Sequence, residues 1–310
     1  MRACRTKRGR AGRVVFPPAQ IAEVKAVACE PPSQAAPLSR RSGADVHRLV
    51  IERSICEASR STVLRWLRED AIRPWLYRSW IFPTDPLFAE KAGRIVDLYA
   101  GRWEGKLLHP GDCVISADEK PSIQARGRIC PTLPPAAGVP RGQRVEHTYR
   151  RGGALTYLAA WDVRRGRVFG RSEPTGGILP FDRLVHQVMT KEPYASAPRV
   201  FWIVDNGSSH RGKASVRRLQ GRWPNLILVH TPVHASWINQ IEIFFSIVQR
   251  KVLTPNDFDS LTQVARRLNE FEKRYNQIAE PFGWNFTRDK LDDMLTRLSD
   301  RQTHQLAAAA

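Results

Sequence analysis

The alternation of hydrophobic and polar positions divides the chain into a helical N-terminal part and a strand-rich part that begins near residue 112. In the first part, apolar residues recur at i, i+3 and i+4 spacing, as in Val63, Trp66 and Leu67. This spacing predicts short helices, and either Ser59 or Ser61 is a candidate N-cap for the helix that carries these three residues. The predicted helices of this part cover residues 18–28, 44–55, 60–69 and 86–99.

From residue 112 onward, short apolar runs alternate with amphipathic segments. Runs rich in β-branched and aromatic residues predict strands, and the segment 164–166 (Arg-Arg-Gly) predicts a hairpin turn between two of them. The predicted strands are residues 113–117, 155–163, 167–171, 200–204 and 226–230, and the predicted helices are residues 181–191, 211–221, 238–253 and 258–278. Three strands followed by alternating helices and strands predict an α/β domain with one mixed sheet.

Composition refines this division into five regions. Six basic and no acidic residues stand in the first thirteen positions, and several prolines follow them. Such a composition is typical of a partly disordered arm. We therefore expect a basic, proline-rich arm (1–43), a helix-turn-helix segment (44–70), a linker with a helix (71–110), an α/β domain (111–285), and a C-terminal helix and tail (286–310).

The charge balance indicates a polyanionic partner. Lys and Arg number 49 against 30 Asp and Glu, a formal net charge of +19. Neutralising phosphates with basic side chains releases counterions, so nucleic acid attracts such a chain. A membrane is disfavoured because no apolar run approaches 18 residues and no amphipathic anchor is evident. A basic surface that only aids solubility, or a ribosome-associated protein, remains the alternative.

The cysteines and the N-terminal residues exclude other classes. The five cysteines are scattered and form no CxxC pair, which argues against a disulfide framework and against a zinc site. No apolar segment follows the basic N-terminus as it would in a secretory signal, so we expect a cytoplasmic location.

The predicted helix at residues 60–69 is a candidate DNA-recognition helix. Its outer face is expected to carry Arg60, Thr62, Arg65 and Arg68, which suits the second helix of a helix-turn-helix motif in a DNA groove. A helical hairpin with no role in DNA binding has the same pattern, and the sequence leaves both interpretations open.

Three carboxylates stand where chemistry is expected. Asp118 and Asp205 each end an apolar strand, and side chains at strand ends project into a crevice. Glu242 lies on the predicted helix 238–253, in a polar stripe with Asn239. Each acid also has an ordinary interpretation, because an Asp after a strand commonly forms a turn and a helical Glu is commonly solvated.

Taken together, the three acids suggest a site for hard cations. Three carboxylates in one crevice cannot all stay ionised without a compensating cation, and oxygen ligands select Mg²⁺ or Mn²⁺. Two such ions about 4 Å apart would activate a water or hydroxyl and stabilise the leaving oxygen of a phosphodiester.

The sequence motifs around the three acids resemble those of DDE transposases of the mariner-like superfamily, specifically its bacterial insertion-sequence branch. The first is Ser-Ala-Asp-Glu-Lys around Asp118, and the second is Val-Asp-Asn-Gly-Ser-Ser-His from residue 204. The third, residues 230–242, follows the pattern Thr-Pro…Ser-Trp-x-Asn-x-x-Glu and ends at Glu242. The 36 residues between Asp205 and Glu242 are close to the spacing of that family.

The resemblance implies an RNase H-like fold for residues 111–285, a five-stranded mixed sheet flanked by helices. It also implies that Asp118, Asp205 and Glu242 hold two Mg²⁺ or Mn²⁺ ions, with Asp118 bridging both. Asn206, His210 and Asn239 are then neighbours that support these ligands.

The activity implied is metal-dependent cleavage at element ends, followed by attack of the freed 3′-hydroxyl on target DNA. The expected partners are double-stranded DNA, as terminal inverted repeats and as target, and a second copy of the chain on paired ends. The expected location is a bacterial cytoplasm, at the nucleoid when bound to DNA.

The sequence departs from the family pattern in one respect. Such transposases commonly carry two helix-turn-helix units, and only one is evident here, at residues 44–70. The alternatives are a catalytically decayed DNA-binding relative and an RNase H-like nuclease without strand transfer.

Overall fold

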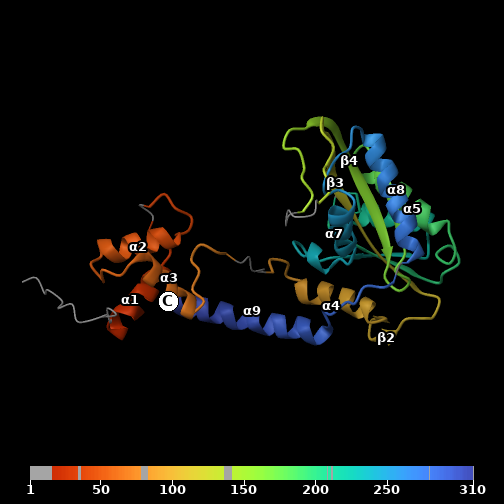
Figure 1. Cartoon of the computed structure of the whole chain (residues 1–310). Helices are drawn as coiled ribbons and strands as arrows, with labels where there is room; N and C mark the ends of the chain where they lie inside the picture. The colour runs from red at the N-terminus through yellow and green to blue at the C-terminus, as the bar shows by residue number, and fades with distance from the viewer. Residues whose placement is uncertain are drawn as a thin grey trace, which may run out of the picture. The chain divides into compact units, whose positions relative to one another are not determined.

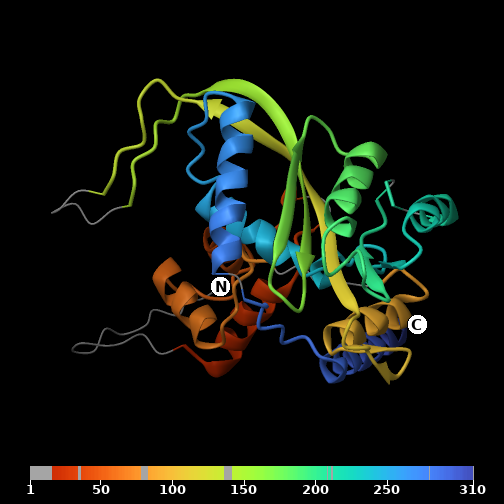
Figure 2. The same ribbon diagram turned by 90° about the vertical axis from the view of Figure 1, so that its right-hand side faces the viewer.

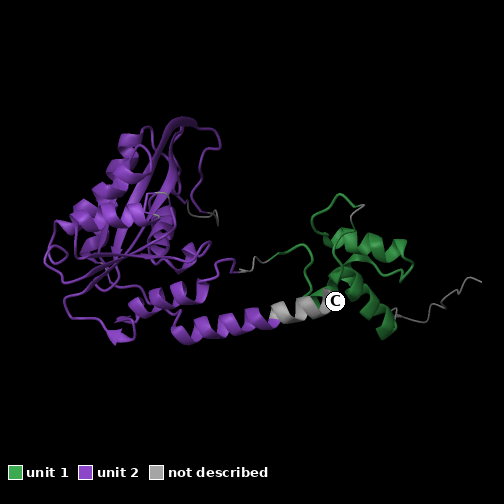
Figure 3. Ribbon diagram, turned by 180° about the vertical axis from the view of Figure 1, so that it is seen from behind, with its two compact units in different colours: residues 1–81 green, residues 82–310 purple. Residues whose placement is uncertain are grey.

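The computed structural model describes residues 16–33, 36–77, 83–135, 142–207, 209–210, 212–278 and 280–309, with side chains described up to residue 300. The chain forms two compact units, Met1–Ile81 and Phe82–Ala310 (Figure 3).

The first unit is built from three helices around one small core. They are α1 (Pro18–Cys29), α2 (Gly43–Glu52) and α3 (Arg60–Glu69). Val24, Val46 and Val63, one from each helix, are fully buried together. The segment that forms α1, which the sequence analysis placed in the arm, is thus part of the same core as α2 and α3.

Side chains cap the two helices that the helix-turn-helix prediction concerned. Ser42 and Asp45 form a capping box at the start of α2. Of the two predicted candidates, Ser59 rather than Ser61 caps α3, by accepting a hydrogen bond from the Thr62 amide. These caps explain why α2 and α3 begin where they do.

The second unit is organised around a five-stranded sheet with the order β5-β4-β3-β6-β7. Its strands are β3 (Cys113–Gly127), β4 (Arg150–Asp162), β5 (Val168–Glu173), β6 (Val200–Val204) and β7 (Leu226–His230) (Figure 1). β3, β6 and β7 run parallel, whereas β4 pairs antiparallel with β3 and β5. The predicted mixed sheet of five strands is confirmed.

Helices cover both faces of the sheet, and the strand residues alternate between two cores. On one face, Val114 and Phe201 pack with residues of α7 and α8; on the other, Ile115 and Trp202 pack with residues of α5 and α6. The helices of this unit are α4 (Phe88–Tyr99), α5 (Ile178–Met189), α6 (Gly212–Arg222), α7 (Ile241–Lys251), α8 (Leu261–Gln277) and α9 (Arg288–Ala309) (Figure 2). A two-stranded ribbon, β1 (Arg102–Trp103) with β2 (Lys106–Leu107), follows α4.

The prediction that a strand ends at residue 117 is wrong. β3 continues through Asp118 to Gly127, because the first half of β4 pairs with it over this length. The parallel ladder with β6 does end at Ser116. Asp118 therefore lies within a strand, but just beyond the point where that strand loses its second neighbour.

The predicted helices are present with small shifts at their ends. The predicted helix 238–253 is shortened at both ends, since residues 236–238 form a separate 3₁₀ turn and α7 spans Ile241–Lys251. None of the helices that the structure describes is long and apolar enough to cross a membrane.

Candidate active site

The register of the sheet places the two aspartates level with each other. β3 and β6 pair in parallel with Ser116 opposite Ile203, and continuing this register by two residues sets Asp118 beside Asp205. Side chains two residues apart on a strand share a face. Asp118 thus follows Val114 and Ser116 on the face covered by α7, and Asp205 follows Ile203 on that face.

Glu242 comes to this face from the first turn of α7. Its carboxyl is close enough to the aspartates to affect their charge states. Burial raises the pKa of Asp118 to about 7, with further contributions from Asp205 and Glu242. Burial also raises the pKa of Glu242, where Lys120 acts to lower it and Asp205 to raise it. The three acids therefore form one region of concentrated negative charge.

Asp205 differs from the other two acids because it has hydrogen-bond donors of its own. His210 Nε2 and the Gly207 amide both contact Asp205 Oδ1, the amide at 2.8 Å, and the histidine bond is foremost in lowering the pKa of Asp205. His210 is 2% exposed, and its Nδ1 lies 2.9 Å from Ser209 Oγ. His210 is thus a direct neighbour of a candidate catalytic carboxylate.

The oxygen ligands of the three carboxylates suit a hard cation, but the side chains do not form a complete coordination site. Among the described residues, no group of three His, Cys, Asp or Glu side chains is arranged to hold a metal ion. Carboxylates repel one another when no cation lies between them, and Asp205 is turned to His210.

A buried polar network fixes the start of α7 against β3. Asn239 is fully buried; its Nδ2 donates to the Ala117 carbonyl at 3.0 Å, and its Oδ1 accepts a hydrogen bond from Ser116 Oγ. Ser116 Oγ also accepts from the Ile241 amide at 2.9 Å. This network sets the position of Glu242 relative to Asp118.

Tyr99 on α4 completes the network from the other side. Its hydroxyl donates to the Ile238 carbonyl at 2.9 Å and accepts from the Gln240 amide at 3.2 Å. Sequence reasoning missed both Tyr99 and Ser116. For Ser116 a signal existed, since it lies two residues before Asp118 and so shares its strand face; for Tyr99 there was none, because its partners lie about 140 residues away.

The other predicted supporting residue, Asn206, stands one step further from the carboxylates. Its Nδ2 donates to the Thr231 carbonyl at 2.7 Å and ties the end of β6 to the end of β7. A cavity of about 620 Å³ opens beside it, lined by Asp205, Asn206, Gly207 and residues 231–236. The cavity gives Asp205 access to solvent.

The predicted DNA-contacting residues lie together on α3 in the first unit. Arg60, Arg65 and Arg68 are exposed, whereas Thr62 is half-buried and its hydroxyl pairs with Ser59 Oγ at 2.9 Å. Three of the four side chains are therefore available to a ligand, and the fourth serves the helix cap.

A mixed five-stranded sheet with two level aspartates on its central strands, and a glutamate on the helix that covers them, defines a domain of the RNase H-like class. In a comparison with sequence families, residues 130–265, less than half of the chain, are similar to the family described as DDE superfamily endonuclease. The match includes Asp205 and Glu242 but begins after Asp118, which joins them through the sheet register.

Solved structures share this fold. The Mos1 mariner paired end complex with Mn is 15% identical, with a TM-score of 0.54 over 96% of this chain and 80% of that one. The Mos1 mariner paired end complex with Mg is 16% identical, with a TM-score of 0.53 over 94% and 80%. A search of curated proteins gives no match.

The match to the DDE superfamily endonucleases over residues 130–265 agrees with the predicted resemblance, and the similar solved structures share the predicted fold. The mariner-like type stays a prediction. Placement in the insertion-sequence branch stays a prediction.

Proposed function

We propose that this chain is a DDE transposase that cuts DNA at the ends of a mobile element and joins the freed ends to target DNA. The observation that carries the proposal is that Asp118, Asp205 and Glu242 come to one face of the sheet, the aspartates through the strand register and the glutamate from the first turn of α7. Burying mutually repelling carboxylates is unfavourable, and a fold retains such an arrangement where a cation is to be bound. The match to the DDE superfamily endonucleases and the net charge of +19 support the same conclusion.

Asp118, Asp205 and Glu242 would hold two Mg²⁺ or Mn²⁺ ions. Bound ions of this kind would supply Lewis-acid activation of the attacking water or 3′-hydroxyl and charge stabilisation at the leaving oxygen. His210 would orient the Asp205 carboxylate, and Asn239 would keep Glu242 in reach of the aspartates by anchoring the start of α7.

The similar solved structures suggest the partners. They are named as Mos1 complexes with paired ends, with a left transposon end, and as a strand transfer complex. We propose that this chain likewise binds the terminal inverted repeats of its element and a target duplex, and that two copies act on paired ends.

The test is a cleavage and joining assay on labelled DNA that carries the element ends flanking the gene. With Mg²⁺ or Mn²⁺ the wild-type chain is expected to cut the ends and to yield joined products. Asp205→Asn is expected to abolish both, whereas Glu270→Gln, an exposed carboxylate on α8, is expected to change neither. If the wild type cuts DNA but yields no joined product, the chain is a nuclease instead. If the wild type does not cut DNA, and DNA binding is unchanged when the acids are replaced, the chain is a decayed DNA-binding relative.

A further inference from the structure

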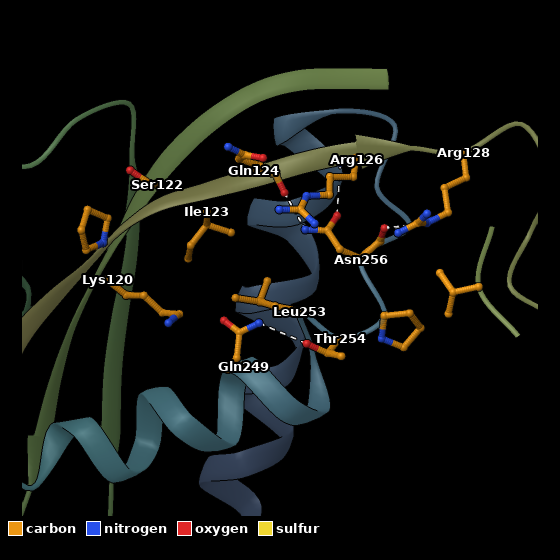
Figure 4. A pocket seen from close by; sticks show the side chains of 13 residues that line it. Lys120, Ser122, Ile123, Gln124, Arg126, Arg128, Gln249, Leu253, Thr254 and Asn256 are labelled. Atoms are coloured by element: carbon orange, nitrogen blue, oxygen red, sulfur yellow. Dashed lines mark hydrogen bonds between the residues drawn. The ribbon is translucent and has the colours of Figure 1, made fainter. Parts of the chain in front are cut away.

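A groove lies beside the candidate active site, along the half of β3 that sequence reasoning did not expect. It has a volume of about 410 Å³ and is formed by β3, the end of α7 and the segment that follows it (Figure 4). We call it the basic groove. Its polar lining side chains are Lys120, Ser122, Gln124, Arg126, Arg128, Gln249, Thr254 and Asn256.

The positive charge of the basic groove is only partly neutralised by nearby carboxylates. Of its three cations, only Arg128 forms an ion pair, with Asp257 at 2.7 Å. Among the described residues, no carboxylate lies within ion-pair distance of Lys120 or Arg126. No carboxylate stands among the residues that line the groove.

Arg126 in particular is held in place without a charged partner. Its guanidinium stacks over the Tyr149 ring, 4.8 Å from the ring centre, and its Nε is buried with no hydrogen-bond partner. Its backbone amide donates to Asn256 Oδ1 at 3.2 Å, and Asn256 Nδ2 donates to the Gln124 carbonyl at 2.7 Å. Because the Nε is enclosed, the groups of Arg126 that can reach a ligand are the terminal nitrogens of this half-exposed side chain. A planar cation fixed by its neighbours suits an oxyanion such as phosphate.

The strand itself leads from the groove to the carboxylates. Beyond Asp118, every residue from Lys120 to Gln124 lines the groove, and from there Arg126 and Arg128 line it while Ala125 and Gly127 are buried. The ladder to β4 shifts register between Lys120 and Ile123, and such bulges commonly re-aim side chains beside active sites. A strand rises about 3.3 Å per residue, so Lys120 and Arg126 are separated by somewhat less than ~20 Å, enough for more than one phosphate.

We infer that the basic groove binds the phosphodiester backbone of the DNA strand that reaches the candidate active site, with Lys120 and Arg126 as its phosphate contacts. The inference rests on the proposed function for the identity of the nucleic acid. Lys120 is the contact nearest the carboxylates, since it lies two residues after Asp118 on β3. Arg126 holds the same strand further along β3.

The test measures affinity for a short DNA duplex with a recessed end, by fluorescence anisotropy, from about 50 to 200 mM salt. Each phosphate contact contributes about 0.9 to the slope of log affinity against log salt, or a three- to fourfold change over this range. Lys120→Gln and Arg126→Gln are each expected to lower the slope by that amount. The matched control is Arg167→Gln, an exposed arginine in the turn at the opposite end of β4, which is expected to leave the slope unchanged.

A second measurement locates the contact. Single phosphates of the DNA are replaced in turn by uncharged methylphosphonates. At one position near the recessed end, the substitution is expected to weaken binding by the wild-type chain but not by Arg126→Gln. Arg126→Lys, which keeps the charge, is expected to keep most of the salt slope.

Three outcomes would overturn the inference. In the first, the groove variants show the same salt dependence of affinity as Arg167→Gln. In the second, Arg126→Gln and Arg126→Lys both melt at a lower temperature with no change in salt dependence, which would make the role of Arg126 structural only. In the third, RNA binds through the groove and DNA does not. If the wild type fails to cut DNA while the groove variants still lose slope, the proposed function fails and the groove assignment stands.

Discussion

The two halves of β3 differ in almost every physical respect. From Cys113 to Ser116 the strand has a neighbour on each side and its side chains are buried. From Lys120 to Gly127 it has β4 alone; it is exposed at Pro121 and Ser122 and then alternates buried with half-exposed positions. The first half ends in the negative region around Asp118, and the second half lines the basic groove.

This difference corresponds to two functions, holding the carboxylates and binding a polyanion. Carboxylates that repel one another need a rigid, buried support to hold them together, and the central part of the sheet supplies it. Cations that attract a polyanion act best at an accessible surface, where they bind in a salt-dependent manner. We therefore expect substitutions in the first region to affect chemistry and stability, and substitutions in the second to affect affinity and its salt dependence.

The largest expected effect is on strand cleavage. Asp118→Asn should lower the single-turnover cleavage rate by at least about 10³-fold, because a lost metal ligand removes several kcal/mol of charge stabilisation. Glu119→Gln is the matched control, since the neighbouring side chain points to the opposite strand face and should keep near wild-type activity. Arg126→Gln should recover the wild-type rate at low salt and saturating DNA, which Asp118→Asn should not. Equal losses of cleavage rate in Asp118→Asn and Glu119→Gln would contradict the assignment of chemistry to the Asp118 side of the strand.

The next effect concerns pH and the stability of the metal-free chain. The pKa of Asp118 is raised to about 7 in the fold, so the folded state binds a proton that the unfolded state releases near pH 4. The unfolding free energy should therefore fall as the pH rises from about 4 to 7. Each pKa unit corresponds to about 1.4 kcal/mol, which gives a loss of roughly 2–4 kcal/mol.

Denaturant titrations at pH 5 and pH 8 would measure this loss. Asp118→Asn should be more stable than the wild type at pH 8 and should show a flatter pH profile. Added Mg²⁺ should stabilise the wild type at pH 8 more than the variant, because a ligand stabilises the state that binds it. A wild type that gains stability between pH 5 and pH 8 would show that the acids are not coupled as described.

A somewhat smaller effect is expected in the polar network that joins the two sides of the site. Ser116→Ala leaves Asn239 Oδ1 and the Ile241 amide without a partner, at a cost of about 1–3 kcal/mol. Both the unfolding free energy and the cleavage rate should fall, because α7 and Glu242 lose their anchor. Ser116→Thr should restore part of both. A variant that loses cleavage at unchanged stability would instead place Ser116 in direct contact with the substrate.

Sequence patterns were sufficient where local periodicity and burial agree. The strands Val200–Val204 and Leu226–His230 have the predicted bounds because each is a short, continuous apolar run in a parallel sheet. α3 also has its predicted bounds, since Ser59 caps it and the apolar spacing continues to its end. The three acids could be chosen because each stands beside such an element.

The pattern failed where pairing between distant segments decides the structure. The far half of β3 contains Pro121 and several charges, which locally disfavour a strand, and it is a strand because β4 pairs with it. The basic groove could not be found for the same reason, since its two walls lie about 130 residues apart. The sequence predicted only that His210 lies near Asp205. The hydrogen bond between them depends on the conformation of the turn that connects them.

The smallest expected effect extends the comparison to the first unit, where α3 carries exposed arginines of a different kind. The basic groove should hold phosphates without regard to sequence, whereas a recognition helix contacts base edges. Arg65→Ala should therefore weaken binding to the element ends by about 1 kcal/mol, roughly fivefold, and weaken binding to random DNA less. Arg126→Gln should weaken both to the same extent. Arg48→Ala, an exposed arginine on α2 paired with Asp45, is the control and should change neither affinity. Competition of end DNA against random DNA measures the ratio directly, and an unchanged ratio for Arg65→Ala would leave α3 as a structural helix of its unit.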